Sequence, residues 1–406
     1  MGPARRVFAG SRLLVFVVAA FAAVAFPAGI GARTAERGIV HPFGGWPLRG
    51  LFDSVLSPLV RWDGFWYLRI AEHGYQTHVE ALRGGRVFFP LYPLLVRGAG
   101  GFADNGVALI AAVVISLAAL AVGLTLLHRL TAMELGGRAA DATVLLLAFA
   151  PVAFFFSAPY TESLFLVLSV GAFLAARRGR WALAGLAAGA ASGTRSTGAL
   201  LLLPLLILYL YGPRADRESP PARPGWRALI PRHAVRPDIL WLVLAPVGIV
   251  AFSLYLREST GDALAWAHFQ PLFGRRAIEW PTETVRQAAV AGFHALKGDG
   301  SHLYRGPILV ESVYLPAALV ATVGVFRRLP FAYGAYSLTA LLLAISSPAY
   351  PEPLRSLPRL LLPVFPLTMW LASWTERRGI TRGAIVASGA ALAVLTAAFA
   401  SWQPYV

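Results

Sequence analysis

The chain has 406 residues, of which 57% are hydrophobic and only 14% are charged. This balance lies far outside the range of soluble globular domains and predicts a polytopic membrane protein. The net charge of +16 does not indicate a nucleic-acid partner, because the arginines are spread among loops that flank hydrophobic runs, where membrane lipids with anionic headgroups account for them. The absence of cysteine excludes disulfide bonds and thiolate sites.

The first hydrophobic run extends from Leu13 to Ala32 and follows three arginines, Arg5, Arg6 and Arg12. It is long enough to cross a bilayer, although a cleaved signal peptide would look similar. The positive-inside rule then places the N-terminus in the cytoplasm and the chain from residue 33 onward outside.

Residues 33–105 are too polar and too rich in proline and glycine to cross a membrane, so we expect an outer loop there. Residues 61–75 mix aromatic and charged side chains at helical spacing, which is typical of an amphipathic helix lying at the membrane interface. Pro93 is suited to the first turn of a second interfacial helix.

Ten further hydrophobic runs follow, and with the first they predict about eleven spans in a single integral-membrane domain over residues 1–406. They cover residues 107–127, 142–158, 164–176, 181–193, 199–211, 239–256, 308–326, 331–346, 360–374 and 384–402. Residues 213–238 form an inner loop rich in arginine and proline, and residues 257–307 form a second outer loop. The short runs 181–193 and 199–211 meet at Arg195, which predicts a turn below the outer surface.

Under this topology the outer face collects a group of ionisable and aromatic residues: Arg61, Asp63, Tyr160, Glu162, Arg195, His268, Arg355 and Arg359. Ionisable groups at the ends of spans are costly unless they are paired or functional. A structural role competes with function at several of them, since an acid in a first helical turn suits the helix dipole and arginines mark interfaces. No His, Cys, Asp or Glu spacing predicts a metal site, and no nucleotide-binding motif is present.

One carboxylate and several arginines at an outer membrane surface suit a transfer from a lipid-linked phosphate. Such a carboxylate can take a proton from an acceptor hydroxyl. Guanidinium groups can hold the departing phosphate bidentately, a task for which arginine is better suited than lysine.

Four sequence blocks resemble the PIG-V family of mannosyltransferases. They are RWDGFWYLRIAEHGY at residues 61–75, FFPLYP at 88–93, PYTES at 159–163 and TRSTG at 194–198. The first block is fairly specific, and the resemblance runs from about Arg61 to Pro204 and more loosely to Arg359.

The resemblance implies an all-α GT-C glycosyltransferase fold that takes mannose from a polyprenyl-phosphate-mannose donor on the outer side of the membrane. It implies that Asp63 is the catalytic residue and that the reaction inverts the sugar without a metal or other cofactor. Eukaryotic members add a mannose to the GPI anchor, but this Ala-, Gly- and Arg-rich chain looks bacterial, so that acceptor is not carried over.

We therefore expect an enzyme of the cytoplasmic membrane with an extracytoplasmic site. Asp63 is the predicted general base; the predicted phosphate-binding residues are Arg195, Arg359, Arg355 and Arg61; the predicted sugar- or acceptor-binding residues are Trp62, Tyr92, Tyr160, Glu162 and His268. The acceptor would be a glycolipid, a lipid-linked glycan or a cell-envelope polymer, and glucose or a pentose could replace mannose. Two rival functions remain, a lipid or small-molecule transporter (or flippase) and a catalytically silent scaffold.

Overall fold

A computed structural model describes residues 3–26, 42–76, 80–217, 230–275, 278–299 and 302–403. Throughout these residues the regular secondary structure is helical, and the strand-like pairing among them is limited to an isolated antiparallel bridge between Arg275 and Ala349. The predicted all-α fold class is confirmed.

The helices of the first half, in chain order, are α1 (Pro3–Ala25), α3 (Arg49–Val55), α4 (Gly64–His73), α5 (Leu91–Val96), α6 (Asn105–Leu135), α7 (Gly137–Ala148) and α8 (Glu162–Arg177). Those of the second half are α9 (Trp181–Ser192), α10 (Leu202–Tyr211), α11 (Val247–Thr260), α12 (Ala265–His268), α13 (Pro281–Lys297), α14 (His302–Arg328), α15 (Phe331–Ile345), α16 (Leu357–Leu361), α17 (Phe365–Arg377) and α18 (Thr381–Ala400). Short 3₁₀ turns join some of them, at Ser57–Leu59, Glu80–Val87, Ala153–Phe156, Ser196–Leu201, Pro237–Leu244 and Gln270–Phe273, and a π-helical turn covers Arg97–Gly101.

Local chemistry fixes the ends of the longest helix. Asp104 begins α6, because its Oδ1 accepts a hydrogen bond from the backbone N–H of Val107 at 2.8 Å. Gly136 ends the same helix with a φ of 88°, a left-handed value that glycine adopts without steric cost.

Within the described residues, four helices are long and apolar enough to cross a membrane: Ala4–Ala25, Asn105–Leu135, Tyr304–Arg328 and Thr381–Ala400. A fifth span results if Pro237–Leu244 and Val247–Thr260, which meet at 45°, count as one. The chain is therefore a multi-pass membrane protein, as predicted, but the predicted number of about eleven spans is not confirmed. Apolar helices such as Trp181–Ser192 and Phe331–Ile345 are shorter than a full crossing.

The predicted span 142–158 shows why hydropathy overestimated helix length. Helix α7 ends at Ala148, and the chain turns before the 3₁₀ segment that begins at Ala153. The backbone carbonyls of both residues accept hydrogen bonds from the buried guanidinium of Arg12 at 2.9 Å, and Ser157 Oγ accepts another at 2.8 Å. Arg12 of α1 thus supplies hydrogen bonds to backbone carbonyls at a break in an apolar run, where water does not reach them.

The two predicted outer loops contain helices. Helix α4 occupies the predicted amphipathic stretch, and Pro93 lies in the first turn of α5. The predicted second outer loop, residues 257–307, contains the 17-residue helix α13. Residues 33–41 of the first predicted loop and residues 218–229 of the predicted inner loop lie outside the described residues.

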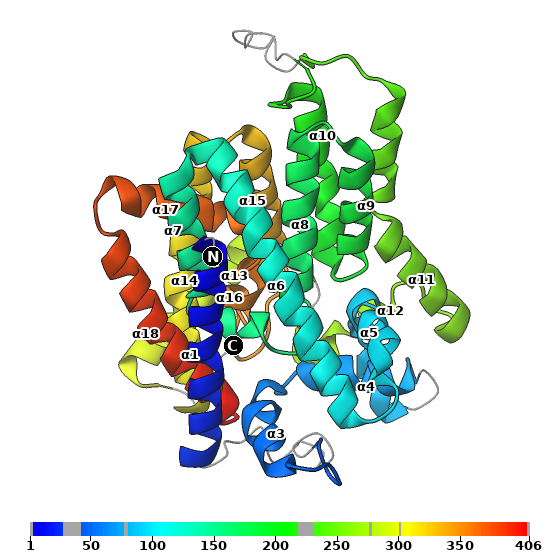
Figure 1. Cartoon of the computed structure of the whole chain (residues 1–406), viewed down its shortest axis with the longest axis vertical. Helices are drawn as coiled ribbons and strands as arrows, with labels where there is room; N and C mark the ends of the chain where they lie inside the picture. Colours follow the sequence, from blue (N-terminus) through cyan, green and yellow to red (C-terminus); the bar gives the residue numbers. More distant parts are fainter. Residues whose placement is uncertain are drawn as a thin grey trace.

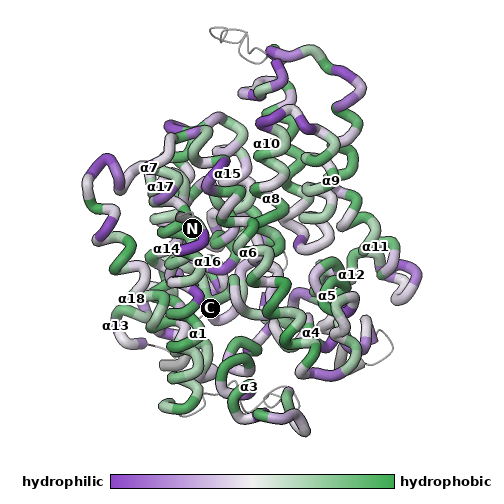
Figure 2. Tube along the Cα trace, viewed as in Figure 1, coloured by the Kyte–Doolittle hydropathy of each residue, from purple (hydrophilic) through white to green (hydrophobic). Residues whose placement is uncertain are grey.

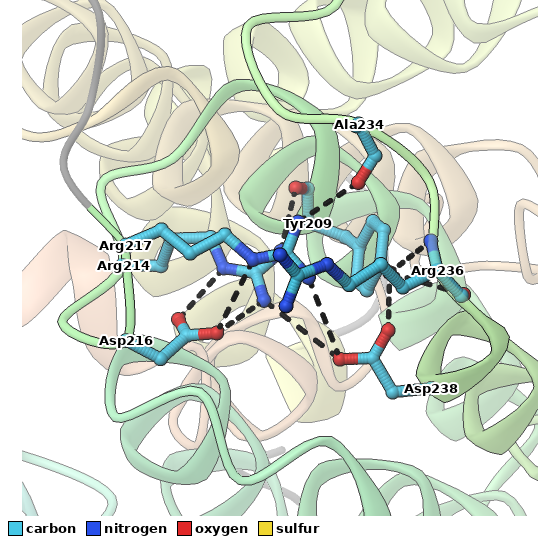
Figure 3. A network of polar contacts seen from close by, with 7 residues as sticks. All are labelled: Tyr209, Arg214, Asp216, Arg217, Ala234, Arg236 and Asp238. Carbon is cyan, nitrogen blue, oxygen red and sulfur yellow. Dashed lines mark hydrogen bonds and ion pairs between the residues drawn. The ribbon is translucent and has the colours of Figure 1, made fainter.

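Figure 1 shows α4 and α5 at one end of the molecule and the chain that follows α10 at the opposite end. Polar residues gather at helix ends, while the helices themselves are mostly apolar (Figure 2). Past α10, the guanidinium of Arg214 lies over the rings of both Trp181 and Tyr209, at 4.6 and 4.7 Å from their centroids, and pairs with Asp216. Asp238 accepts from the Tyr209 hydroxyl in the same network (Figure 3).

Candidate active site

A cavity of about 1190 Å³ lies among segments that are far apart in the sequence. Its lining comes from the start of α4, the turn after α9, the region around α12, and the segment 347–360 that leads into α16. Both aromatic and charged side chains face it, so the cavity has the size and the chemistry for a sugar attached to a charged group.

Asp63 is the carboxylate at the start of α4 that lines this cavity. The residue before it, Trp62, has a φ of 52°, which a large side chain rarely adopts and which the surrounding structure must hold in place. The buried Tyr160 contributes, since its hydroxyl donates to the backbone carbonyl of Arg61 at 2.8 Å. Asp63 Oδ2 then accepts a hydrogen bond from the guanidinium of Arg359 at 2.6 Å.

Two arginines and one further acid complete this part of the site. Glu162, at the first turn of α8, has a side chain only 2% exposed, and its Oε1 lies 3.3 Å from Arg195 and 3.8 Å from Arg359. Arg359 lies over the ring of Tyr160 at 5.4 Å. Burial lowers the pKa of Arg359, but the negative charges of Asp63 and Glu162 outweigh this effect and raise the pKa above its usual value. Arg359 is therefore a permanent cation between two carboxylates.

A second basic pair lines the cavity from the segments 273–275 and 347–355. Arg355 donates to Glu352 at 2.8 Å and to the backbone carbonyl of Phe273 at 2.9 Å. Arg275 donates to the backbone carbonyls of Ser347 and Arg355, at 3.1 and 3.2 Å. Arg355 thus anchors the backbone two residues before Arg275, and Arg275 anchors the backbone at Arg355.

His268 lies at an exposed part of the cavity wall. Its Nδ1 is 2.8 Å from Asp262 Oδ2, an arrangement that fixes the orientation of the imidazole ring.

Seven of the predicted site residues line the cavity: Trp62, Asp63, Tyr160, Arg195, His268, Arg355 and Arg359. Glu162 lies behind two of the arginines rather than on the lining. The structure places Arg61 and Tyr92 elsewhere, and neither is part of the site as described. Arg61 donates to the carbonyls of Val60 and Ala400 at 2.9 Å, and the Tyr92 hydroxyl donates to that of Ala112 at 2.9 Å.

Tyr67, Trp266 and Arg275 are among the lining residues that the predictions omitted. Tyr67 follows Asp63 by four residues, so helical spacing could have revealed it. Trp266 is close to His268 in the sequence, and its indole donates to Ser253 at 3.0 Å. Arg275 gave no local signal, because its partners lie more than 70 residues away.

No group of three or more His, Cys, Asp or Glu side chains that could hold a metal occurs within the described residues. The prediction of a metal-independent reaction remains a prediction.

The family described as Mannosyltransferase (PIG-V) matches residues 12–206. GPI alpha-1,6-mannosyltransferase 2 of Mus musculus is 33% identical over 162 residues, which cover 37% of this chain and 32% of the relative. The protein of the same description from Rattus norvegicus is 35% identical over 163 residues, covering 36% and 31%. The match therefore spans about a third of the length of these curated relatives.

Among solved structures, ArnT from Cupriavidus metallidurans bound to undecaprenyl phosphate is similar at a TM-score of 0.49 and 13% identity, over 98% of this chain and 75% of that chain. The all-helical structure of the described residues agrees with the predicted all-α fold class. Over residues 12–206 the chain is a match to the PIG-V mannosyltransferase family, which confirms the resemblance found in its sequence.

Proposed function

We propose that this protein is a glycosyltransferase of the GT-C type that moves mannose from a polyprenyl-phosphate-mannose donor to a glycolipid or cell-envelope glycan. The observation that carries the proposal is the cavity in which Asp63 lies beside Arg359, with Arg195 on the same lining. A general base next to cations that can hold a phosphate is the set of groups that such a transfer needs.

In the proposed reaction the acceptor hydroxyl attacks the anomeric carbon of the donor sugar and its proton passes to the carboxylate of Asp63. The bond between the anomeric carbon and the phosphate oxygen breaks, and the phosphate departs with the bonding electrons. Arg195, Arg355 and Arg359 line the cavity where they can stabilise that charge. Trp62, Tyr160 and His268 contribute the sugar-binding surface. Attack opposite to the leaving group inverts the anomeric centre.

We further propose that the site faces the outer side of the cytoplasmic membrane and that the N-terminus lies in the cytoplasm. The short loops dense in arginine support this orientation through the positive-inside rule. The position of α4 and of the chain after α10 at opposite ends also agrees with it (Figure 1).

The test is a complementation experiment with envelope glycolipids measured by mass spectrometry. Cells that lack the gene should lose a mannosylated species, and the wild-type gene should restore it. Asp63→Asn keeps the size of the side chain and removes the base, so transfer should fall by about 10²- to 10⁴-fold. Asp299→Asn, at an exposed residue outside the cavity lining, is the matched control and should restore the species fully. Full restoration by Asp63→Asn would remove Asp63 from the mechanism.

A further inference from the structure

The Asp, Glu, Arg and His side chains on the cavity lining each have an ionisable partner of the opposite type, with one exception among the described residues. Asp63 pairs with Arg359, Arg195 with Glu162, Arg355 with Glu352 and His268 with Asp262, at distances from 2.6 to 3.3 Å. Arg275 lines the same cavity, yet no carboxylate of the described residues lies within 4.0 Å of it. Among the described lining residues, Arg275 is therefore the cation without a carboxylate in direct contact.

Arg275 is held in place by backbone rather than by an acid. Two of the five N–H donors that a guanidinium carries reach the carbonyls of Ser347 and Arg355. The backbone of Arg275 is itself bridged to Ala349, so the side chain extends from an anchored segment. The remaining donors have no hydrogen-bond acceptor among the described residues.

Arg275 shares the cavity lining with Asp63 and Arg359 and interacts electrostatically with both. It also interacts with Arg355 and with the carboxyl of Glu311, which is not within 4.0 Å. Burial, with the neighbouring cation of Arg359 adding to it, lowers the pKa of Arg275 to about 10. The side chain remains a cation at neutral pH, and an anion bound beside it would relieve the cost of burying that charge.

We propose that Arg275 binds the phosphate of the lipid donor and is the principal counter-ion of that phosphate in the cavity. This inference rests on the proposed function and adds a residue to it. Arg195, Arg355 and Arg359 already have carboxylate partners, so a phosphate has to compete with those partners at each of them. At Arg275 the phosphate does not compete with a carboxylate in contact with the guanidinium. The remaining N–H groups of Arg275 can donate to two oxygens of the phosphate.

The experiment compares two lipids that differ by the phosphate alone, undecaprenyl phosphate and undecaprenol. Each is titrated onto the full-length protein in detergent, and the bound fraction is measured by native mass spectrometry. The variants are Arg275→Gln and Arg275→Lys. The matched control is Arg286→Gln on α13, where the arginine is 65% exposed, is paired with Glu283 and does not line the cavity.

The wild-type protein should prefer the phosphorylated lipid, and Arg275→Gln should reduce that preference by about 10- to 100-fold, the effect of losing a charged hydrogen-bond donor. Arg275→Lys should retain part of it, since lysine keeps the charge and loses the bidentate geometry. Arg286→Gln should behave as the wild type does.

The other outcomes separate this inference from the proposed function. If the wild type does not distinguish the two lipids, the polyprenyl-phosphate donor itself is wrong. If the wild type prefers the phosphate and both Arg275 variants keep the full preference, the role of Arg275 is wrong while the donor stands. An equal loss of both lipids in Arg275→Gln would indicate a structural role and would also overturn the inference.

Discussion

Glu162 connects the two arginines nearest to Asp63. It approaches Arg195 at 3.3 Å and Arg359 at 3.8 Å from the same oxygen. Its other oxygen and the Nε of Arg359 are buried and have no hydrogen-bond partner among the described residues. Because a buried carboxylate is costly unless it is paired, the position of Glu162 depends on both arginines, and their positions depend on it.

The first prediction concerns the stability of this buried pair. Arg195→Gln should lower the free energy of unfolding by about 3 kcal/mol, since it leaves the carboxylate of Glu162 without its closer partner. The double variant Arg195→Gln with Glu162→Gln should recover part of the loss, because no unpaired charge remains. Thermal unfolding in detergent measures both. A double variant less stable than either single one would contradict the pairing.

The second prediction separates pairing from substrate binding at the same residue. Arg195→Lys keeps the charge beside Glu162, so its stability should stay near that of the wild type. Lysine loses the planar fork, so the affinity for the donor and the turnover should fall about tenfold or more if Arg195 contacts the phosphate. Unchanged donor affinity and turnover would restrict Arg195 to a structural role.

The third prediction is that transfer does not need a metal. In the proposed mechanism arginines neutralise the departing phosphate, which is the task of a divalent cation in other transferases. Activity in detergent should therefore persist in EDTA. Loss of activity that Mg²⁺ or Mn²⁺ restores would show that a metal neutralises the phosphate.

Among the helices, α9 determines where the Arg195 turn lies. A Cβ added at Gly185 would be 2.0 Å from the backbone oxygen of Trp241, and one at Gly189 would be 2.6 Å from that of Leu244. These two glycines, four residues apart, form a face on which the 3₁₀ segment Pro237–Leu244 packs closely. The packing of Gly185 and Gly189 against this 3₁₀ segment positions α9 and therefore the turn after it, which carries Arg195.

The fourth prediction tests this contact with a single methyl group. Gly185→Ala should lower the free energy of unfolding by about 1–3 kcal/mol, because the backbone of Trp241 must move away. Gly171→Ala in α8 is the control, since its Cβ would meet only Leu126 at an ordinary 3.8 Å. Equal melting temperatures for the two variants would show that α9 does not pack against this segment as described.

The candidate active site and the arginine network around Arg214 belong to different parts of the molecule. The site lies at the start of α4 and in the turn after α9, whereas the network follows α10. Figure 1 shows α4 and the chain after α10 at opposite ends. A transfer on the outer side requires these two ends to face different sides of the membrane.

The fifth prediction is this orientation, and the natural absence of cysteine makes it straightforward to measure. A single cysteine at Asp299, between α13 and α14, should react with a membrane-impermeant maleimide in intact cells. One at Arg138, near the start of α7, should react only after permeabilisation. Both residues are exposed, so access to the reagent depends on the side of the membrane. Labelling of the cysteine at position 138 in intact cells would contradict the proposed topology.

The sequence alone determined the features that depend on neighbouring residues. Composition gave the membrane class, and helical periodicity gave α4, because an amphipathic face is a local pattern. The Asp63 block and the two short helices that meet near Arg195 were also visible, since helix breaks follow local turn chemistry. Hydropathy predicted one continuous span over residues 142–158, because it averages over windows and does not register a break such as the one that Arg12 satisfies.

Which charged side chains pair with each other depends on the tertiary packing. The hydrogen bond between Asp63 and Arg359 joins residues 296 positions apart, and no local pattern predicts such a contact. The same holds for Arg275, whose partners near residue 350 leave it as the one cation on the lining without a carboxylate within 4.0 Å among the described residues. The sequence therefore supplied the chemical groups of the site. Packing decided which of them pair with each other and which are left for a ligand, because the energy of a buried charge depends on what surrounds it in space.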